Sequence, residues 1–346
     1  MQSIAQKMKK HPEITIHSIA RELNISASTI SRALKNNPRI SEKTRKTVQD
    51  KALEMGYRPN IVAANLRSRQ TKTIGVVVPR IDRHFFSSAI SGIEEYAGSM
   101  GFNVLISQSN DLISKEENCV RTLYNNRVDG MIISISMQTR EGTHLRLFSD
   151  NHIPILFFDR YCQDMESDRI LVDDFNSGYT ITSHLIERGC KRIAHIAGPE
   201  LLNIYRDRKA GYLKALEDSG FPVGEGFLEV TGLTREEGKQ AFARLMALPV
   251  PPDGVFCGND TTALSALEYC NENNLSVPNT VALVGFSDEP FSAVVTPSLS
   301  TVKQPGYEMG FLAAQKIIHR IQHNNEVIPF EQIIFPTRLI IRNSSK

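Results

Sequence analysis

A short segment near the N-terminal end carries small polar side chains and one arginine, a combination that could contact a nucleic acid. Its members are Ser26, Ala27, Ser28, Thr29, Ser31 and Arg32. The planar fork of Arg32 can donate two hydrogen bonds to O6 and N7 of guanine, and we expect Ala27 and Ser28 to lie near base edges as well. The remaining hydroxyl residues, Ser26, Thr29 and Ser31, are expected to contact phosphates.

Two short helices joined by a tight turn would present this segment. The first is indicated by apolar residues at helical spacing, namely Ile16, Ile19, Ala20 and Leu23. Ser26 is a suitable N-cap for a second helix that begins near Ala27. A third helix is expected from Ser41 to Met55, with an inward face of Val48, Ala52 and Leu53 and with Gly56 as its stop. This arrangement predicts a helix-turn-helix unit whose second helix fits the major groove of DNA.

The charge is distributed unevenly along the chain. The 346 residues have a formal net charge of +2, yet residues 1–70 hold 14 Lys or Arg against 5 Asp or Glu, a net +9, which leaves −7 for the rest. A basic head on an acidic body favours a head that neutralises phosphates. The alternatives are a solvated charged surface, or three small helices that only dock another protein.

From Thr73 onward, short β-branched runs alternate with helical stretches. Strands that are apolar on both faces and alternate with helices predict parallel sheets covered on both sides. The expected strands are Thr73–Val78, Asn103–Ser107, Gly130–Ser134, Ile155–Phe158, Ile193–Ala197, Gly254–Cys257 and Val281–Gly285. The expected helices are Ser87–Met100, Lys115–Asn125, Gly178–Glu187, Arg206–Asp218, Arg235–Met246 and Asp260–Asn273.

Motifs for catalysis and metal binding are missing from the sequence. The five cysteines form no CxxC pair, the nine histidines have no HExxH spacing, and neither a GxGxxG loop nor a GxSxG elbow is present. We therefore expect no enzyme, no metal and no cofactor, although a Ser-His-Asp triad stays open. The N-terminus lacks a signal peptide and no apolar run reaches membrane-spanning length, so a cytoplasmic protein without a membrane partner is expected.

Residues 14–70 resemble the DNA-binding headpiece of the LacI/GalR family of regulators. The matching stretches are IHSIARELNIS, STISRALK, ISEKTRKTVQDKALEMGYRPN and AANL. The resemblance implies that the segment after the YRPN motif forms a hinge helix on operator DNA, with Leu66 wedged into the minor groove and Asn60 and Ala63 supporting it. Lys35 stands where many members carry Asn, and is expected to preserve a phosphate contact.

The resemblance continues to about Arg342, and implies a two-lobed α/β core like the type I periplasmic binding proteins. Its domains would be an extension at 1–13, a helix-turn-helix domain at 14–59, a hinge helix and linker at 60–71 and the core at 72–346. Lobe one would comprise about 72–172 and 302–332, and lobe two about 173–301 and 333–346.

Several polar and aromatic residues follow the predicted strands, where ligands bind in open α/β sheets. They are Phe85, Phe86, Asp159, Arg208, Asn259, Asp260, Ser287 and Asp288. Such side chains suit a sugar, because they bind vicinal hydroxyls and cover a ring face. For each residue taken alone, a helix cap or a core position is nearly as good an interpretation. Ser287 stands where many members carry Asp, so either Ser287 or Asp288 would take the ligand role.

The resemblance therefore implies a dimeric repressor that binds double-stranded operator DNA and is controlled by a small effector, most simply a sugar or sugar derivative. Two rivals remain at this point. One is a sugar-binding protein without a DNA function, and the other is a cytoplasmic α/β enzyme.

Overall fold

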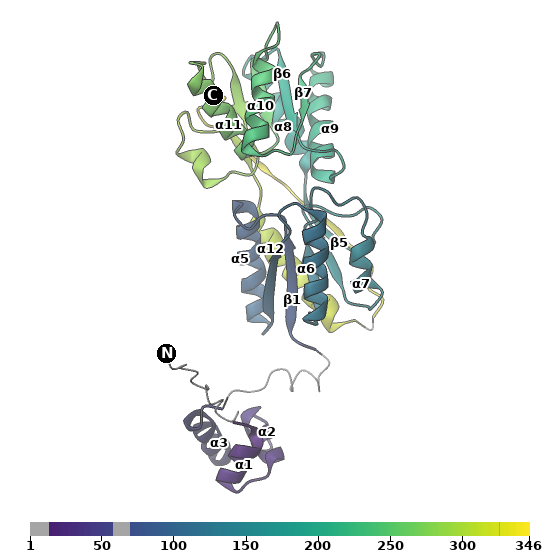
Figure 1. Cartoon of the computed structure of the whole chain (residues 1–346), viewed down its shortest axis with the longest axis vertical. Coiled ribbons are helices and arrows are strands. Elements are labelled where there is room, and N and C mark those ends of the chain that lie inside the picture. Colours follow the sequence, from purple (N-terminus) through teal and green to yellow (C-terminus); the bar gives the residue numbers. More distant parts are fainter. Residues whose placement is uncertain (1–13, 58–69, 325) are drawn as a thin grey trace, which may run out of the picture. The chain divides into compact units, whose positions relative to one another are not determined.

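The computed structural model describes residues 14–57, 70–324 and 326–346. They belong to two compact units, one up to Thr71 and one from Lys72 to Lys346, which are treated separately below (Figure 1). The predictions for residues 1–13 and for Asn60, Ala63 and Leu66 lie outside the described residues.

The first unit, the head, contains three helices around a small apolar core. They are α1 (Ile16–Leu23), α2 (Ala27–Leu34) and α3 (Glu42–Glu54). Each begins at a hydroxyl side chain that accepts a hydrogen bond from a backbone N–H of the first turn, in the order Thr15, Ser26 and Ser41. The core consists of the buried side chains Ile19, Ile30, Ala33, Val48 and Ala52. The head therefore has the predicted helix-turn-helix arrangement.

One inward position of α3 was predicted wrongly. Leu53 is 83% exposed, whereas Val48 and Ala52 are buried. Residues 48, 52 and 55 recur on one helical face, because a turn takes 3.6 residues, and Met55 packs against the core in the place expected for Leu53.

The second unit, the core, begins with a six-stranded parallel sheet that forms lobe one. The strand order is β11-β5-β4-β3-β1-β2. The strands are β1 (Thr73–Val78), β2 (Asn103–Gln108), β3 (Gly130–Ile133), β4 (Ile155–Phe158), β5 (Asp168–Val172) and β11 (Gln332–Phe335). Every neighbouring pair is parallel, as expected for strands joined by helical crossovers.

Helices cover both faces of this sheet. Side chains of α5 (His84–Ser99) and α12 (Gly306–Gln322) pack on the face that includes Ile74 and Val76. On the other face lie α6 (Ile113–Asn125), the 3₁₀ turn η1 (Thr143–Leu145) and α7 (Arg146–Ser149). Successive residues of β1 therefore enter different apolar clusters, which explains why the strand is apolar throughout.

Lobe two has a four-stranded parallel sheet in the order β7-β6-β8-β9. Its strands are β6 (Ile193–Ala197), β7 (Leu228–Val230), β8 (Gly254–Cys257) and β9 (Ala282–Val284). The helices α8 (Asp174–Glu187) and α9 (Asn203–Asp218) pack together on one face. The pair α10 (Arg235–Met246) and α11 (Asp260–Glu272) covers the other face, and η2 (Pro290–Ala293) follows β9.

The chain crosses between the lobes three times, as Figure 1 shows for the segments that join the two sheets. The first crossing lies between β5 and α8. β10 (Thr301–Lys303) pairs antiparallel with β12 (Arg338–Ile340), and both strands pack against lobe two. β11 pairs with β5 of lobe one. The second and third crossings therefore follow Lys303 and Phe335, a few residues later than the predicted boundaries at 302 and 333. No helix in the described part of the chain is long and apolar enough to cross a membrane.

Candidate nucleic-acid interface and ligand cleft

The polar residues of α2 divide into two groups. The Oγ of Ser26 accepts from the backbone N of Thr29 at 3.2 Å and lies 2.8 Å from the Thr29 Oγ1, so these two side chains close the first turn of the helix. Ser28 also contacts Ser26, at 2.9 Å between hydroxyl oxygens. The phosphate contacts predicted for Ser26 and Thr29 would therefore be made by hydroxyls that already cap the helix.

The second group is available for binding. Arg32 and Lys35 are exposed, and neither side chain forms a hydrogen bond or ion pair with any described residue. Ala27 and Ser31 are half-buried at the edges of the same helix. An exposed helix with two unpaired cations can enter a groove without first breaking internal contacts.

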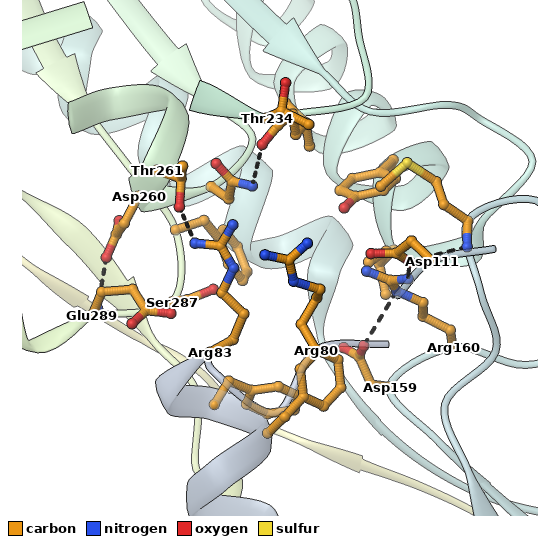
Figure 2. A pocket seen from close by; sticks show the side chains of 18 of the residues that line it. Arg80, Arg83, Asp111, Asp159, Arg160, Thr234, Asp260, Thr261, Ser287 and Glu289 are labelled. Atoms are coloured by element: carbon orange, nitrogen blue, oxygen red, sulfur yellow. Dashed lines mark hydrogen bonds and ion pairs between the residues drawn. The ribbon is translucent and has the colours of Figure 1, made fainter. Parts of the chain in front are cut away.

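The core contains a cleft between its two lobes, with a volume of about 390 Å³ (Figure 2). It lies at the carboxyl ends of the strands, where the N-termini of α5, α9 and α11 also meet. Every residue predicted to bind the effector lines it, except Asp288. The side chains differ, however, in whether they still have hydrogen-bonding capacity.

Arg208 is held in place by a buried ion pair. Its Nε donates to Asp174 Oδ1 at 2.7 Å and its Nη1 donates to the Gly258 carbonyl at 3.0 Å, while the guanidinium lies 3.5 Å from the ring centre of Phe286. Burial raises the pKa of the Asp174 carboxyl to about 7, against the opposing effect of Arg208. The Nη2 of Arg208 has no hydrogen-bond partner among the described residues, so this nitrogen can donate a hydrogen bond to a ligand.

Two glycines bring Arg208 and Asp174 together. A Cβ at Gly178 of α8 would overlap the carbonyl oxygen of Arg208, and one at Gly211 of α9 would overlap that of Phe175. The two helices can therefore pack in direct backbone contact only because both positions lack a side chain.

Asp260 and Asn259 hold the start of α11. The buried Asp260 carboxylate accepts from Thr301 Oγ1 at 2.6 Å, Ser292 Oγ at 2.8 Å and the backbone N of Glu289 at 2.7 Å. Burial raises its pKa to about 6, and these hydrogen bonds oppose the rise. Asn259 caps the helix through the backbone N of Thr262 at 2.8 Å. Both residues therefore shape the cleft wall, which is the helix-cap interpretation considered from the sequence.

Asp159 is buried at the opposite side of the cleft. Its backbone has a φ of 65°, and its Oδ2 accepts from Ser134 Oγ at 3.2 Å and lies 3.6 Å from the Nε of Arg160. Burial raises the pKa of the Asp159 carboxyl, and Arg160 opposes that rise. Arg160 also pairs with Asp111 at 2.6 Å. Figure 2 shows these three residues together at one end of the cleft.

Phe85 and Phe86 form an apolar wall at the first turn of α5. Their ring centres lie 5.1 Å apart in an edge-to-face arrangement, and both rings contact Phe158. The two side chains are at the same time core residues and cleft residues, so both interpretations of the sequence apply to them.

The structure places Ser287 and Asp288 differently. Ser287 lines the cleft and donates to Gln304 Oε1 at 3.1 Å. Asp288 points elsewhere, because both residues have positive φ and its carboxylate accepts from Arg342 at 2.7 Å. The expectation that Asp288 faces the ligand therefore needs correction, and Ser287 is the member of this pair at the cleft.

Other residues of the cleft were not singled out from the sequence. They include Arg80, Arg83, Asp111, Arg160, Tyr205, Thr234, Arg235, Glu289 and Gln304. Arg80 and Arg83 follow β1 and precede α5, so the rule applied to the other strand ends would have found them.

Several hydrogen bonds cross between the lobes, among them three that involve residues of the cleft. The Nη1 of Arg83 in lobe one donates to Thr261 Oγ1 in lobe two. The Glu289 carboxylate of lobe two accepts from the backbone N of His84 at 3.2 Å. The Nδ2 of Asn203 donates to the Asp159 carbonyl at 3.0 Å. A ligand that displaces or strengthens such contacts would change the relative free energy of open and closed lobes.

The described residues contain no group of His, Cys, Asp and Glu side chains arranged to hold a metal ion. A helix-turn-helix head on a two-lobed α/β core with an interlobe cleft defines the class of ligand-responsive, DNA-binding regulators.

Comparisons with known proteins agree with this class. Residues 15–60 match the family described as "Bacterial regulatory proteins, lacI family", and residues 182–345 match the "Periplasmic binding protein-like domain". The chain belongs to the lacI family of bacterial regulatory proteins. It is 30% identical over 334 residues to catabolite control protein A of Priestia megaterium, covering 96% of this chain and 99% of that protein.

A second relative is the HTH-type transcriptional repressor CytR of Escherichia coli (strain K12), 30% identical with 98% of both chains covered. Among solved structures, the Lac repressor dimer bound to operator and the anti-inducer ONPF matches with a TM-score of 0.84 at 24% identity, covering 96% of this chain and 99% of that one. The latter likeness shows that the fold, including both the head and the core, is shared.

Proposed function

We propose that this regulator is a repressor that binds a pseudo-palindromic operator as a homodimer and is controlled by a small polyhydroxylated effector in the cleft. The observation that carries the proposal is the α2 surface of a basic head, where the Arg32 and Lys35 side chains are exposed and unpaired within the described part of the chain. Ala27, Ser28 and Ser31 would complete the contacts, with Arg32 reading a base and Lys35 binding phosphate.

A dimer is supported by the edge of lobe one. β2 is the last strand of its sheet, and Leu105 and Ile106 on it are exposed apolar residues. Such an edge is usually covered by a partner. The Lac repressor structure described above is itself a dimer on operator DNA. Two heads related by a two-fold axis would read two half-sites.

The proposed switch rests on sequence resemblance. Asn60, Ala63 and Leu66 would form the hinge helix, and effector binding would alter how the hinge helices pair. The effector must then bind two conformations of the core with different affinity.

A sugar is the simplest effector for this cleft. Phe85, Phe86 and the Nη2 of Arg208 offer aromatic faces and a hydrogen-bond donor. The regulator CelR, which was solved as a cellobiose complex, matches this chain with a TM-score of 0.72 at 25% identity. The carboxylates of the cleft are engaged in hydrogen bonds and ion pairs that hold its shape, so we propose a binding protein and not an enzyme, acting in the cytoplasm where its operator lies.

A gel-shift titration with DNA fragments from the gene's own neighbourhood tests the proposal. The wild type is expected to bind one fragment tightly, and Arg32→Ala and Lys35→Ala are each expected to weaken that binding. Lys214→Ala, which removes a half-exposed cation on α9 of the core, serves as the control and should bind like the wild type.

A protein that retards none of these fragments even at low salt would contradict the DNA-binding part of the proposal. Equal binding by the wild type and the Arg32→Ala/Lys35→Ala double variant would contradict the assignment of α2 as the interface.

A further inference from the structure

The cleft has an excess of positive charge on its lobe-one rim. Arg80 and Arg83 lie on the loop between β1 and α5, and Figure 2 shows their side chains next to each other with both guanidinium groups pointing into the cleft. Two like charges in this arrangement repel each other unless an anion lies between or above them.

The two arginines of this pair are less completely neutralised by protein carboxylates than the other arginines of the cleft. Of the five arginines that line it, Arg160 pairs with Asp111, Arg208 with Asp174, and Arg235 with Glu268. Arg83 forms no ion pair among the described residues, and its hydrogen-bond partner is the hydroxyl of Thr261.

Arg80 has one carboxylate partner, which is open to solvent. Its Nε and Nη2 donate to the two carboxylate oxygens of Asp82, each at 3.1 Å, but the Arg80 and Asp82 side chains are 42% and 63% exposed. An ion pair that is open to water contributes little and exchanges readily with a competing anion. The guanidinium of Arg80 is therefore available to a ligand that enters the cleft.

The carboxylates of Asp260 and Glu289 on the cleft wall already accept hydrogen bonds from the protein. Asp260 is buried among Thr301, Ser292 and the backbone N of Glu289. Glu289 itself accepts from the backbone N of His84. Glu289 also interacts electrostatically with Arg83, which opposes the rise that burial causes in the pKa of Glu289. It therefore offsets only part of the positive charge of the rim.

The first turn of α5 adds to this potential. The helix has 16 residues and starts directly after Arg83, which occupies the N-cap position without a side-chain capping bond. The backbone N–H of His84 is already bonded to the Glu289 carboxylate, while those of Phe85 and Phe86 have no hydrogen-bond partner among the described residues. Unpaired N–H groups at a helix N-terminus favour a negative charge. The backbone and the two guanidinium groups therefore act on the same region of the cleft.

The remaining walls of the cleft suit the uncharged part of a ligand. Phe85, Phe86 and Tyr205 offer aromatic surface, while Ser287 and Gln304 offer hydroxyl and amide groups. The volume of about 390 Å³ accommodates a small sugar together with an anionic substituent.

We propose that the effector is an anionic sugar, a phosphorylated sugar or a sugar acid, whose oxyanion binds Arg80 and Arg83 at the N-terminus of α5. This inference rests on the effector cleft of the proposed function and specifies the chemical class of its ligand.

Thermal unfolding of the full chain tests the proposal, because a ligand that binds the folded state raises the midpoint. The first probe is inorganic phosphate compared with chloride at equal ionic strength. We expect phosphate to raise the midpoint of the wild type in a concentration-dependent manner. Arg80→Gln and Arg83→Gln should each reduce that rise, Arg83→Lys should keep part of it, and the double Gln variant should abolish it.

Arg244→Gln is the matched control, since Arg244 is an exposed arginine of α10 paired with Glu229 away from the cleft. It should respond to phosphate like the wild type. A rise of the same size in the double Gln variant would mean that phosphate binds elsewhere, and would overturn the proposal. The unfolding midpoints in chloride report whether each variant is folded.

The second set of probes compares each neutral sugar with its charged forms, such as glucose with glucose 6-phosphate and glucuronate, and ribose with ribose 5-phosphate. A larger rise with a phosphate ester or with an acid identifies which oxyanion is used. A neutral sugar that stabilises both the wild type and the double Gln variant, or no rise with phosphate and every anionic sugar, would overturn the inference. Operator binding in the gel shift is measured separately, so the repressor proposal can stand or fail by itself.

Discussion

The head and the cleft present their functional side chains in opposite ways. On α2 of the head, the side chains of Arg32 and Lys35 are exposed and form no hydrogen bond or ion pair with a described residue. In the cleft, Arg208, Asp260 and Asp159 are buried and bonded to other parts of the core. The head can bind with side chains that do little for its stability, whereas the cleft uses most of its charged groups to maintain its own shape.

The comparison predicts first that breaking a buried cleft pair destabilises the core strongly. Asp174→Ala removes the carboxylate partner of Arg208, and both side chains are buried. An unpaired buried charge costs about 3–5 kcal/mol, so the free energy of unfolding of the core in urea should fall by that amount.

Glu272→Ala is the control for this variant, because it breaks the exposed Lys239–Glu272 pair and should cost at most about 1 kcal/mol. A loss below about 1 kcal/mol for Asp174→Ala would contradict the prediction that the buried pair contributes more to the free energy of unfolding than the exposed pair.

The second prediction concerns pH and the buried His195. Its ring is stacked on Phe256 and its Nδ1 bonds the Phe256 carbonyl, and burial lowers the pKa of His195 from 6.5 to about 4. The unfolded chain therefore binds a proton below pH 6.5 that the folded chain takes up only near pH 4. The contribution of His195 to stability is fully present above pH 6.5 and should fall by about 3 kcal/mol as the pH decreases to 4.

His195→Phe should remove this part of the pH dependence of urea unfolding. The exposed His319 of α12 provides the comparison, since His319→Gln should keep the wild-type dependence. The same decrease below pH 6.5 in His195→Phe would show that other groups cause it.

The third prediction turns to the head. Arg32→Ala should cost about 1–3 kcal/mol at one operator position and relax specificity there, because a base contact is lost. The urea unfolding of the protein should remain unchanged. Competition with operator variants that differ at single base pairs measures this, and an even loss of affinity across all of them would make Arg32 a phosphate contact.

The smallest expected effect is that of Ser26→Ala. Ser26 caps α2, so its loss should destabilise the head by about 1 kcal/mol. Hydrogen exchange of the α2 amides in the full chain, above all that of Thr29, should become faster while exchange in the core does not change. Unchanged exchange would mean that Ser26 does not stabilise α2 as a cap, and that its hydroxyl is available only for a DNA contact.

Much of the fold could be predicted because local patterns carry it. β1, β4, β6 and β8 have the expected bounds, since apolar runs bounded by polar residues mark buried strands. α5 and α9 begin three residues earlier than expected. Their N-cap positions are Arg83 and Leu202, which make no side-chain cap and therefore give no signal in the sequence.

Elements that depend on distant partners were not predicted. α12 carries Gly306 and Gly310, which indicate a poor helix, but a Cβ at either would meet the backbone of α5. For the cleft, too, local sequence patterns predict only part of the arrangement. Strand-end positions identified Asp260 and Arg208 as cleft residues, yet their partners Thr301 and Asp174 are 41 and 34 residues away. Tertiary contacts decide which polar groups are already hydrogen-bonded within the protein, and a local sequence pattern does not contain those contacts.

The return of the chain to lobe two through β12 has a consequence for how the core is made. The Ser344 Oγ donates to the Leu283 carbonyl at 2.6 Å, and the Ser344 carbonyl accepts from the Leu283 N at 2.9 Å. Nearby, the Arg342 side chain donates to the Asp288 carboxylate. These residues leave the ribosome after the whole of lobe one, including β11. Ser300 of the main segment already pairs with the edge of β9, but the bonds to Leu283 can form only after residues 338–345 have been synthesised. Lobe two therefore completes this edge of its sheet last.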